Sequence, residues 1–534
     1  MNFLNSGKGY DLFVIEARKK FYVDKTMLIE AVYRHVLESN RFLCLTRPRR
    51  FGKSTAANMI AAFFDTATAE ETRVLFEELA IGKLKEQKLD CWAEQGKRNV
   101  IRINMIDIIT PWVKSYQEFF NDFSESLLED LQEAYPTAGI KDKMALPRAL
   151  ERTADKFIFI IDEWDAIFEE SFMTPKDKKD YLLLLKALLK DKSYVYFAYM
   201  TGILPIAKYS SGSPLNMFGE FSTFGDGIFY PWFGLTKEEI QGVMAKCGVV
   251  RPTIEELGTW YDGYIRSCDG VHIFNPTSVS NALAEGNCRS YWTGTGPMNE
   301  VQDTIKNNVK DLRELMIRMS GGETLSIELT GFAAEKTEIS TQDEILSAMV
   351  VYGFLTYHEK LLRIPNHELM LKYRQALASE PLGLKQSLAS SQKLLDATLN
   401  RDHEEVARLL EELHDEKIPF FNYNDENSLA CVVTVGYLAA LDRYRIKRED
   451  KAGKGYADFT FTPMKKGDTA IILELKYGHS AENALECIRK RDYIKKFKGY
   501  SRVLLVGLNY SEATKKHTCL TEMAGKLFSS KTSY

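Results

Sequence analysis

Residues 41 to 64 restrict the fold most: an apolar run, RFLCLT, is followed by a basic loop, PRRFGK, and a helical segment, STAANMIAAFF. This order predicts a buried strand, a loop and a helix. Two more apolar strands are predicted, FIFIIDEWD from Phe157 and YVYFAYMTG ending near Gly202, with a leucine-rich helix from Tyr181 between them. Because strands alternate with helices, we expect a mostly parallel sheet covered on both faces.

The loop from Arg47 to Ser54 matches the phosphate-binding pattern GxxxxGK[ST], except that Arg47 replaces the first glycine. Such a loop needs inward N–H groups at a helix N-terminus, a lysine for the phosphates and a hydroxyl for Mg²⁺. Gly52, Lys53 and Ser54 supply these parts. A basic surface loop that only caps a helix fits an isolated degenerate motif equally well. The residues expected at the nucleotide are Arg49, Arg50, Phe51, Gly52, Lys53, Ser54 and Thr55.

The second apolar strand favours the nucleotide site, because it ends in Asp162 and Glu163, a Walker B arrangement. Asp162 would orient the water shell of Mg²⁺ together with Ser54, and Glu163 would polarise the attacking water. Thr201 ends the next strand and could sense the γ-phosphate, although a Thr-Gly pair at a strand end is equally often only a turn. The pattern predicts ATP binding and hydrolysis with Mg²⁺, and GTP is the alternative nucleotide.

A second set of charged residues lies near the C-terminus. Asp458 opens a strand, and Glu474 and Lys476 share one face of the next strand, IILELKY. Two carboxylates beside a lysine suit Mg²⁺-dependent phosphodiester hydrolysis, whereas a single ExK is more often a hairpin whose charges face water. A GxxD pattern upstream, a basic helix downstream and a closing strand, RVLLVGL, favour hydrolysis.

The length of 534 residues exceeds what one core supports, since single cores stop growing near about 250–300 residues. Changes in the sequence pattern predict three parts, 1–235, 236–400 and 401–534. The last part contains a predicted apolar helix from Leu429 to Leu441 and predicted strands near 456–462 and 469–477. The net charge of -4 gives no overall attraction to nucleic acid. Eight scattered cysteines favour a reduced cytoplasm, and no apolar run reaches the roughly 18 residues of a membrane span.

Several motifs carry a resemblance to a known family: YVDKT from Tyr22, RPRRFGKS, IDEWD, TGILPIAK, and WYDGY with FNPTS. Over roughly the first 300 residues the chain resembles the "AAA-ATPase-like" group, in which a loop without its first glycine is usual. The resemblance implies that Asp24 and Lys25 lie near the nucleotide and that Lys208 contacts phosphate. An exposed Asp-Lys pair that opens a helix is the alternative for the first two.

The C-terminal segment, with YGFLTY near Tyr352 and IPN at 364–366, resembles the PD-(D/E)xK domain usually found behind this ATPase group. The resemblance implies that Asp458, Glu474 and Lys476 are catalytic, with both carboxylates as metal ligands. It also makes Glu426 a candidate for an acidic residue on the preceding helix.

Two departures from the nuclease pattern bear on activity. Cys487 stands where the downstream helix often carries glutamine, and Tyr456 lies within GYAD, where the family has GRxD. A basic run on this helix could follow a phosphate backbone or form a solvated face: Arg489, Lys490, Arg491 and Tyr493.

The predicted fold is therefore α/β: an AAA-like P-loop NTPase with a parallel sheet and flanking helices, a helical lid and connector, and a restriction-endonuclease-like α/β domain. We expect the NTPase to regulate Mg²⁺-dependent cleavage of DNA or RNA, with defence against phage or mobile DNA as the analogous role. The alternative is a nucleotide-switched binding module with an inactive nuclease fold. A metabolic kinase would leave the C-terminal set unexplained. A homo-oligomer could supply Arg49 or Arg50 in trans, and no membrane partner is expected.

Overall fold

The computed structural model describes residues 2–87, 90–206, 214–222, 228–266, 269–291, 310–329, 341–378, 385–417, 426–465 and 467–524. Contacts divide the chain into two units. The first comprises Met1–Ile254, Tyr264–Asn287 and Leu329–Phe354, and the second comprises Glu255–Gly263, Cys288–Glu328 and Leu355–Tyr534. The three-part division expected from the sequence stays a prediction.

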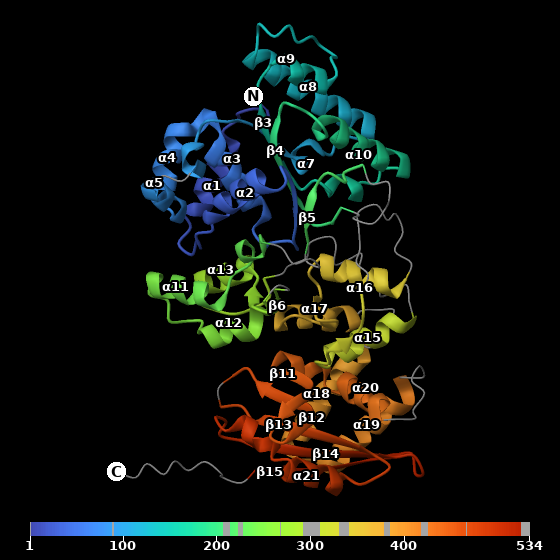
Figure 1. Cartoon of the computed structure of the whole chain (residues 1–534). Coiled ribbons are helices and arrows are strands. Elements are labelled where there is room, and N and C mark those ends of the chain that lie inside the picture. Colours follow the sequence, from blue (N-terminus) through green and yellow to red (C-terminus); the bar gives the residue numbers. More distant parts are fainter. Residues whose placement is uncertain are drawn as a thin grey trace, which may run out of the picture. The chain divides into compact units, whose positions relative to one another are not determined.

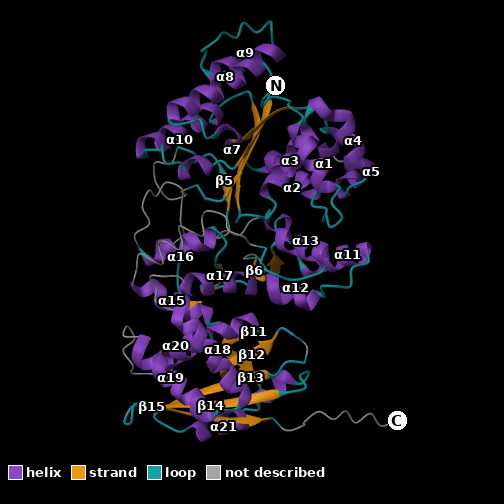
Figure 2. Cartoon of the chain, turned by 180° about the vertical axis from the view of Figure 1, so that it is seen from behind, coloured by secondary structure: helices purple, strands orange, loops and turns teal. Residues whose placement is uncertain are grey.

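A parallel five-stranded sheet forms the centre of the first unit (Figure 1). Its strand order is β2 (Asn99–Asn104), β3 (Phe157–Asp162), β4 (Val195–Gly202), β1 (Phe42–Thr46) and β5 (Gly219–Phe221). Helices α1 (Lys8–Ala17), α2 (Met27–Glu38) and α3 (Lys53–Phe64) lie on one side of the sheet, and α8 (Tyr116–Ala134) and α10 (Pro175–Leu189) lie on the other (Figures 1 and 2). The predicted α/β fold with flanking helices is confirmed.

Burial on both faces explains the apolar strand sequences. Every residue of β1 and of β3 is buried, as expected for parallel strands between two helical layers. Helix α3 presents small residues to α1, where a Cβ added to Gly9 would lie 2.9 Å from the Ala61 Cβ. This close approach packs α1 directly on α3.

Shorter elements complete the first unit and the middle of the chain. The helices are α4 (Ala69–Glu77), α5 (Lys83–Gln87), α6 (Asp90–Ala93), α7 (Met105–Ile108), α9 (Leu146–Arg152), α11 (Lys237–Cys247), α12 (Ile254–Tyr261), α13 (Pro276–Glu285) and α16 (Gln342–Val351). Strands β6 (Asp262–Ile265) and β7 (His272–Phe274) form a two-stranded sheet. The 3-10 helices of the whole chain are η1 (Thr66–Thr68), η2 (Ala80–Gly82), η3 (Ala166–Glu169), η4 (Tyr230–Trp232), η5 (Leu438–Asp442) and η6 (Tyr493–Phe497).

The second unit contains a mixed five-stranded sheet in sequence order: β11 (Tyr444–Ala452), β12 (Gly455–Pro463), β13 (Ala470–Tyr477), β14 (Val503–Ser511) and β15 (Lys516–Met523). Strands β13 and β14 are parallel and the other pairs are antiparallel. A small sheet contains β8 (Leu325–Ser326), β10 (Leu361–Arg363) and β9 (Thr356–His358). The helices are α15 (Lys310–Ser320), α17 (His367–Ala378), α18 (Lys385–Asn400), α19 (His403–Lys417), α20 (Glu426–Gly436) and α21 (Ala481–Lys490).

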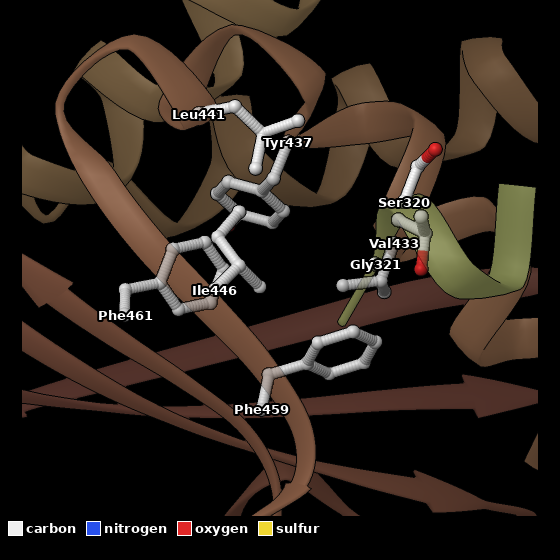
Figure 3. A pocket seen from close by; sticks show the side chains of 9 residues that line it. Ser320, Gly321, Val433, Tyr437, Leu441, Ile446, Phe459 and Phe461 are labelled. Atoms are coloured by element: carbon white, nitrogen blue, oxygen red, sulfur yellow. The ribbon is translucent and has the colours of Figure 1, made fainter. Parts of the chain in front are cut away.

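The two faces of this mixed sheet pack differently. On one face, Leu485 and Ile488 of α21 pack against Ile472 of β13. On the other face, the end of α15, α20 and strands β11 and β12 line a gap that is too small for a water molecule (Figure 3). Most of its lining is apolar and includes Val433, Leu441, Ile446, Phe459 and Phe461, whereas Ser320 and Thr434 are polar.

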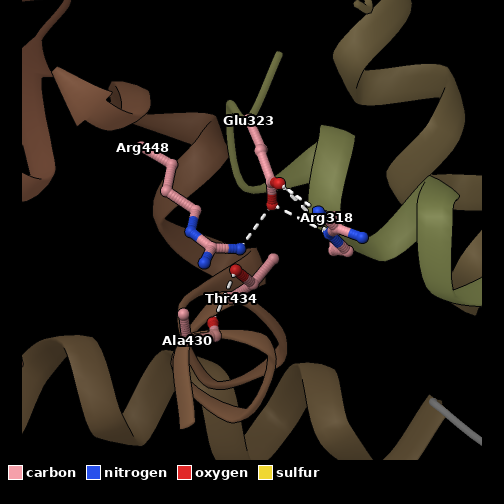
Figure 4. Close-up of polar contacts among 5 residues, drawn as sticks. All are labelled: Arg318, Glu323, Ala430, Thr434 and Arg448. Atoms are coloured by element: carbon pink, nitrogen blue, oxygen red, sulfur yellow. Dashed lines mark hydrogen bonds and ion pairs between the residues drawn. The ribbon is translucent and has the colours of Figure 1, made fainter. Parts of the chain in front are cut away.

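A buried ion cluster fixes the end of α15 to this second face (Figure 4). The Glu323 carboxylate accepts from Arg318 Nε at 3.1 Å and forms an ion pair with Arg448 of β11. The turn between α15 and Glu323 needs glycine, because a Cβ on Gly321 would lie 2.4 Å from Thr434 Oγ1. The segment after α15 is therefore part of the C-terminal core, although it precedes that core by about a hundred residues in sequence.

Candidate functional site

The loop between β1 and α3 has the geometry of a phosphate-binding loop. Gly52 precedes the helix with a φ of 88°, in the left-handed region that favours glycine. Lys53 is buried and its Nζ donates to the carbonyl of Pro48, in the same loop, at 3.1 Å. Burial lowers the pKa of Lys53, whereas the Glu163 carboxylate acts in the opposite direction. The loop therefore holds a buried lysine side chain against its own backbone.

Arg47 has a structural role at the position of the missing glycine. Its guanidinium donates to the carbonyls of Thr46 at 2.8 Å and Phe221 at 2.7 Å, and it lies 4.7 Å from the ring centroid of Tyr230. At the other end of the loop, the buried Phe51 ring packs edge-on against Tyr264 at 5.0 Å. Buried side chains thus anchor the loop at both ends.

The end of β3 brings carboxylates to this loop. Asp162 is fully buried, and burial, with a contribution from Glu163, raises its pKa to about 6, while Ser54 and Lys53 act against this rise. Its Oδ2 atom has no hydrogen-bond partner among the described residues, so an acceptor is available for a cation or its water shell. Glu163 is half-buried with a φ of 50°. Mg²⁺ fits the oxygen donors of Ser54 and Asp162.

The other residues expected at the nucleotide make contacts within the protein. The buried Thr201 hydroxyl donates to the Leu45 carbonyl at 2.9 Å, which joins β4 to β1. The Asp24 carboxylate accepts the N–H of Ala80 at 2.6 Å. Lys25 forms an ion pair with Glu239 at 2.5 Å. Their roles toward the nucleotide stay predictions.

The remaining residues of the loop are more accessible. Arg49 lies 3.5 Å from Glu169, Arg50 has a φ of 69°, and Thr55 lies half-buried in the first turn of α3. Lys208, which the resemblance places at the phosphate, lies outside the described residues.

Two buried charged residues near this site were not predicted. Asp165 accepts backbone N–H groups from Ile203 at 3.0 Å and Leu204 at 2.6 Å, and thereby fixes the segment after β4. Arg102 of β2 donates to Asn58 of α3 at 2.7 Å, and its charge acts on Asp162. The second aspartate of IDEWD was a usable signal for Asp165. Arg102 had no local signal, because its partners are distant in sequence.

The C-terminal set also comes together in space. The Asp458 carboxylate accepts the Leu475 N–H at 2.6 Å, and the Asp458 N–H lies 3.5 Å from Glu474 Oε2. Lys476 Nζ donates to Glu474 Oε1 at 3.3 Å and to the Leu475 carbonyl at 2.7 Å. Glu474 is buried, whereas Lys476 is partly exposed. Asp458 and Glu474 therefore form a carboxylate pair beside a cation.

A divalent cation fits this pair only with water completing its shell. No group of three or more His, Cys, Asp and Glu side chains suited to a metal was found among the described residues. Mg²⁺ commonly uses one or two carboxylates and keeps several waters, so Asp458 and Glu474 suffice. Glu426 begins α20, but its side chain lies outside the described residues.

The end of α21 supplies the rest of the C-terminal site. Burial raises the pKa of the Cys487 thiol to about 11, and the nearby Glu474 carboxylate contributes to this rise. Arg491 Nη1 donates to the Tyr493 hydroxyl at 3.0 Å. The buried Tyr493 in turn donates to the carbonyl of Tyr456, whose ring is 59% exposed. Tyr493 thus links Arg491 to strand β12, two residues before Asp458.

Comparisons with known proteins identify two domains in this chain. Residues 11–211 match the model of a predicted AAA-ATPase family, and residues 424–518 match the PD-(D/E)XK nuclease superfamily. The chain carries an AAA-ATPase-like domain and a PD-(D/E)XK nuclease superfamily domain. The ATPase-like domain contains the loop from Arg47 to Ser54 and the Asp162–Glu163 pair, and the nuclease-like domain contains Asp458, Glu474 and Lys476. The family resemblance found in the sequence is confirmed.

Two individual proteins are similar to this chain. An uncharacterized protein in the vnfD 5′ region of Azotobacter chroococcum mcd 1 is 25% identical over 377 residues, or 67% of this chain. The match spans 66% of that protein, slightly under two thirds of its length. The Walker-type ATPase PABY2304 of Pyrococcus abyssi superposes with a TM-score of 0.34 and 12% identity, over 65% of this chain and 94% of the other. Among the described helices, none is both long and apolar enough to cross a membrane.

Proposed function

We propose that this protein binds and hydrolyses ATP at the Arg47–Ser54 loop and uses the nucleotide to regulate Mg²⁺-dependent cleavage of nucleic acid at Asp458, Glu474 and Lys476. One observation carries the proposal. The buried carboxylate of Glu474 and the ammonium of Lys476, both on β13, lie beside Asp458 on the neighbouring strand β12. Structural charge pairs explain one such contact. They do not explain two carboxylates and a lysine at one strand end within a nuclease superfamily domain.

The ATPase half would act by positioning and charge. Lys53 would bind the β and γ phosphates, backbone N–H groups before Ser54 would bind the phosphate oxygens, and Glu163 would orient the attacking water. Mg²⁺ held by Ser54 and Asp162 supplies charge for the phosphates. Asp24, Lys25 and Thr201 stay candidate contacts, as do Arg49, Arg50, Phe51, Gly52 and Thr55.

The nuclease half would use its carboxylates and lysine together. Asp458 and Glu474 would hold the metal, which supplies Lewis-acid polarisation of the phosphodiester and an activated water. Lys476 would stabilise the developing negative charge or hold the attacking water. The contact between Lys476 Nζ and Glu474 Oε1 at 3.3 Å would keep Lys476 close to the phosphodiester and to the attacking water.

A second candidate function rests on Cys487. A thiol beside Glu474 replaces an amide that the family often uses, which favours an inactive nuclease fold that binds nucleic acid under nucleotide control. In either case we propose a cytoplasmic protein that binds DNA or RNA, and self-association would allow Arg49 or Arg50 to act on a neighbouring ATP site. Defence against phage or mobile DNA is the proposed setting.

Cleavage of labelled single- and double-stranded DNA and RNA tests the proposal. The full chain is incubated with Mg²⁺, with and without ATP, beside Glu474→Ala and the matched control Glu486→Ala, whose carboxylate pairs with Lys490 on the exposed side of α21. We expect cleavage by the wild type and the control, loss in Glu474→Ala, and a change in rate with ATP. Equal cleavage by both variants would contradict the assignment, and ATP binding without any cleavage would favour the binding module.

A further inference from the structure

Three consecutive basic residues lie at the end of α21, and their contacts differ. Arg489 pairs with Glu522 of β15, and Lys490 pairs with Glu486 one helical turn earlier at 2.9 Å. Arg491 instead donates to Tyr493, and this hydrogen bond, with a smaller contribution from the Glu474 carboxylate, raises the pKa of Arg491. The sequence alone did not separate these three residues, whereas their contacts place only Arg491 at the candidate nuclease site.

The backbone around Arg491 is built to hold it there. The Lys454 N–H, in the turn between β11 and β12, donates to the Arg491 carbonyl at 2.8 Å. Gly453 needs to be glycine because an added Cβ would lie 2.3 Å from that carbonyl oxygen, and its φ of 52° is left-handed. At Gly455 an added Cβ would lie 3.1 Å from Arg491 Cδ. The hairpin that leads to Asp458 therefore packs directly on the stem of Arg491.

The hydroxyl of Tyr493 fixes the guanidinium. It accepts from Arg491 Nη1 at 3.0 Å and donates to the Tyr456 carbonyl at 2.5 Å, so its position is set by strand β12. Tyr493 is fully buried, whereas Arg491 is exposed. A guanidinium has five N–H donors in a fixed plane, and the bond to Tyr493 uses one. The others suit the paired oxygens of a phosphate group.

We propose that Arg491 binds a backbone phosphate of the nucleic acid at the nuclease site, and that Tyr493 is the positioning residue that orients it. This inference rests on the proposed nuclease-like function. The part of the nucleic acid that is recognised is the phosphate backbone, which DNA and RNA share. The residue of the basic run that recognises it is Arg491. Arg489 and Lys490 already pair with Glu522 and Glu486, so we do not expect them to supply this contact.

Binding measured over a range of salt concentrations tests the assignment without cleavage. The full chain, in EDTA, is titrated with fluorescent DNA and RNA oligonucleotides. Arg491→Ala should weaken binding about tenfold at low salt and reduce the slope of log K against log salt by about one. Lys490→Ala should leave this slope unchanged, and Arg491→Lys should restore it. Tyr493→Phe should weaken binding less than Arg491→Ala, because the guanidinium loses its orientation but keeps its charge.

The outcomes separate this inference from the proposed function. Equal slopes for Arg491→Ala and Lys490→Ala would overturn the role of Arg491, even if the wild type cleaves nucleic acid. If the wild type never cleaves nucleic acid but Arg491→Ala still lowers the salt slope, the phosphate contact of Arg491 is supported and the proposed nuclease activity is contradicted. Where cleavage occurs, Arg491→Ala should raise KM more than it lowers kcat; an unchanged KM would also reject the phosphate contact.

Discussion

The backbone N–H of Leu204 donates to the carboxylate of Asp165 at 2.6 Å. This bond joins the segment after the Walker B strand to the segment after Thr201, so two strand ends at the phosphate loop are held by one side chain. Gly202 has to be glycine for this contact, because an added Cβ would lie 2.1 Å from Asp165 Oδ1. The edge of the sheet that faces the proposed nucleotide is therefore fixed before any ligand binds.

Titration of Asp165 should appear in the pH dependence of stability. Burial raises its pKa from 3.8 to about 7, so the folded chain holds this proton more tightly than the unfolded chain. The resulting stabilisation is fully present below the unfolded pKa and is lost as the pH rises through the folded pKa. Asp165→Asn has no proton to lose. The Tm of the wild type minus that of Asp165→Asn should fall between about pH 4 and about pH 7 and level off above that; a constant difference would contradict the raised pKa.

Lys53→Ala should remove ATP binding. The buried ammonium is the cation that lies within the loop, and its loss leaves the phosphate charge without that partner. We expect affinity for a fluorescent ATP analogue to fall at least about tenfold, since a hydrogen bond to a charged group contributes roughly 1.5–3 kcal/mol. Lys97→Ala, at an exposed position, is the matched control. Unchanged affinity in Lys53→Ala would remove the phosphate loop from the proposed mechanism.

Glu323→Ala should destabilise the second unit. Its carboxylate bridges Arg318 and Arg448, and the Glu323 and Arg448 side chains are only 10% and 5% exposed. Removing one partner of a buried pair costs about 3–5 kcal/mol. Glu486→Ala, whose pair with Lys490 is 50% and 76% exposed, should cost less than about 1 kcal/mol. Native-state hydrogen exchange of the β11 amides measures both variants, and equal protection would contradict the burial argument.

Gly507→Ala should displace α21 from the sheet. A Cβ at this position would lie 2.4 Å from the Ala481 carbonyl oxygen, so the helix that carries Cys487 would have to shift. Overpacking of this kind costs about 1–3 kcal/mol. A lower Tm and weaker nucleic-acid binding are expected. Gly499→Ala, where no atom lies within 4 Å of the added Cβ, should match the wild type in both measurements.

Much of the fold was predictable because β1, β3 and β4 are largely apolar runs. β11 was not predicted, since charged residues outnumber apolar ones in YRIKREDKA. One of those charges, Arg448, is buried only because Glu323 pairs with it from 125 residues away. A partner so distant in sequence leaves no mark on the local pattern.

The residues of the candidate sites also form two groups, those that a local motif predicts and those whose role depends on contacts in the folded chain. Lys53, Ser54, Asp162 and Glu163 follow from motif spacing, as do Glu474 and Lys476, because each lies at a fixed place relative to a strand or loop. Arg47 reads as basic and exposed, yet its guanidinium is buried by aromatic rings from residues 230 and 233. The IDEWD motif offered a signal for Asp165 and the basic run offered one for Arg491, but their contacts with Leu204 and Tyr493 appear only in the folded chain.

The division into two units has a consequence for how such a protein can arise. The chain passes between the units after Ile254, Gly263, Asn287, Glu328 and Phe354. No single cut in the gene separates the two halves, and a fragment that begins at residue 401 lacks Glu323, which pairs with Arg448 inside the C-terminal core. Exchange of the tail after Phe354 would leave the first unit whole but deprive the second unit of Glu255–Gly263 and Cys288–Glu328. A new C-terminal half therefore has to be compatible with two segments that the chain supplies before the first unit ends.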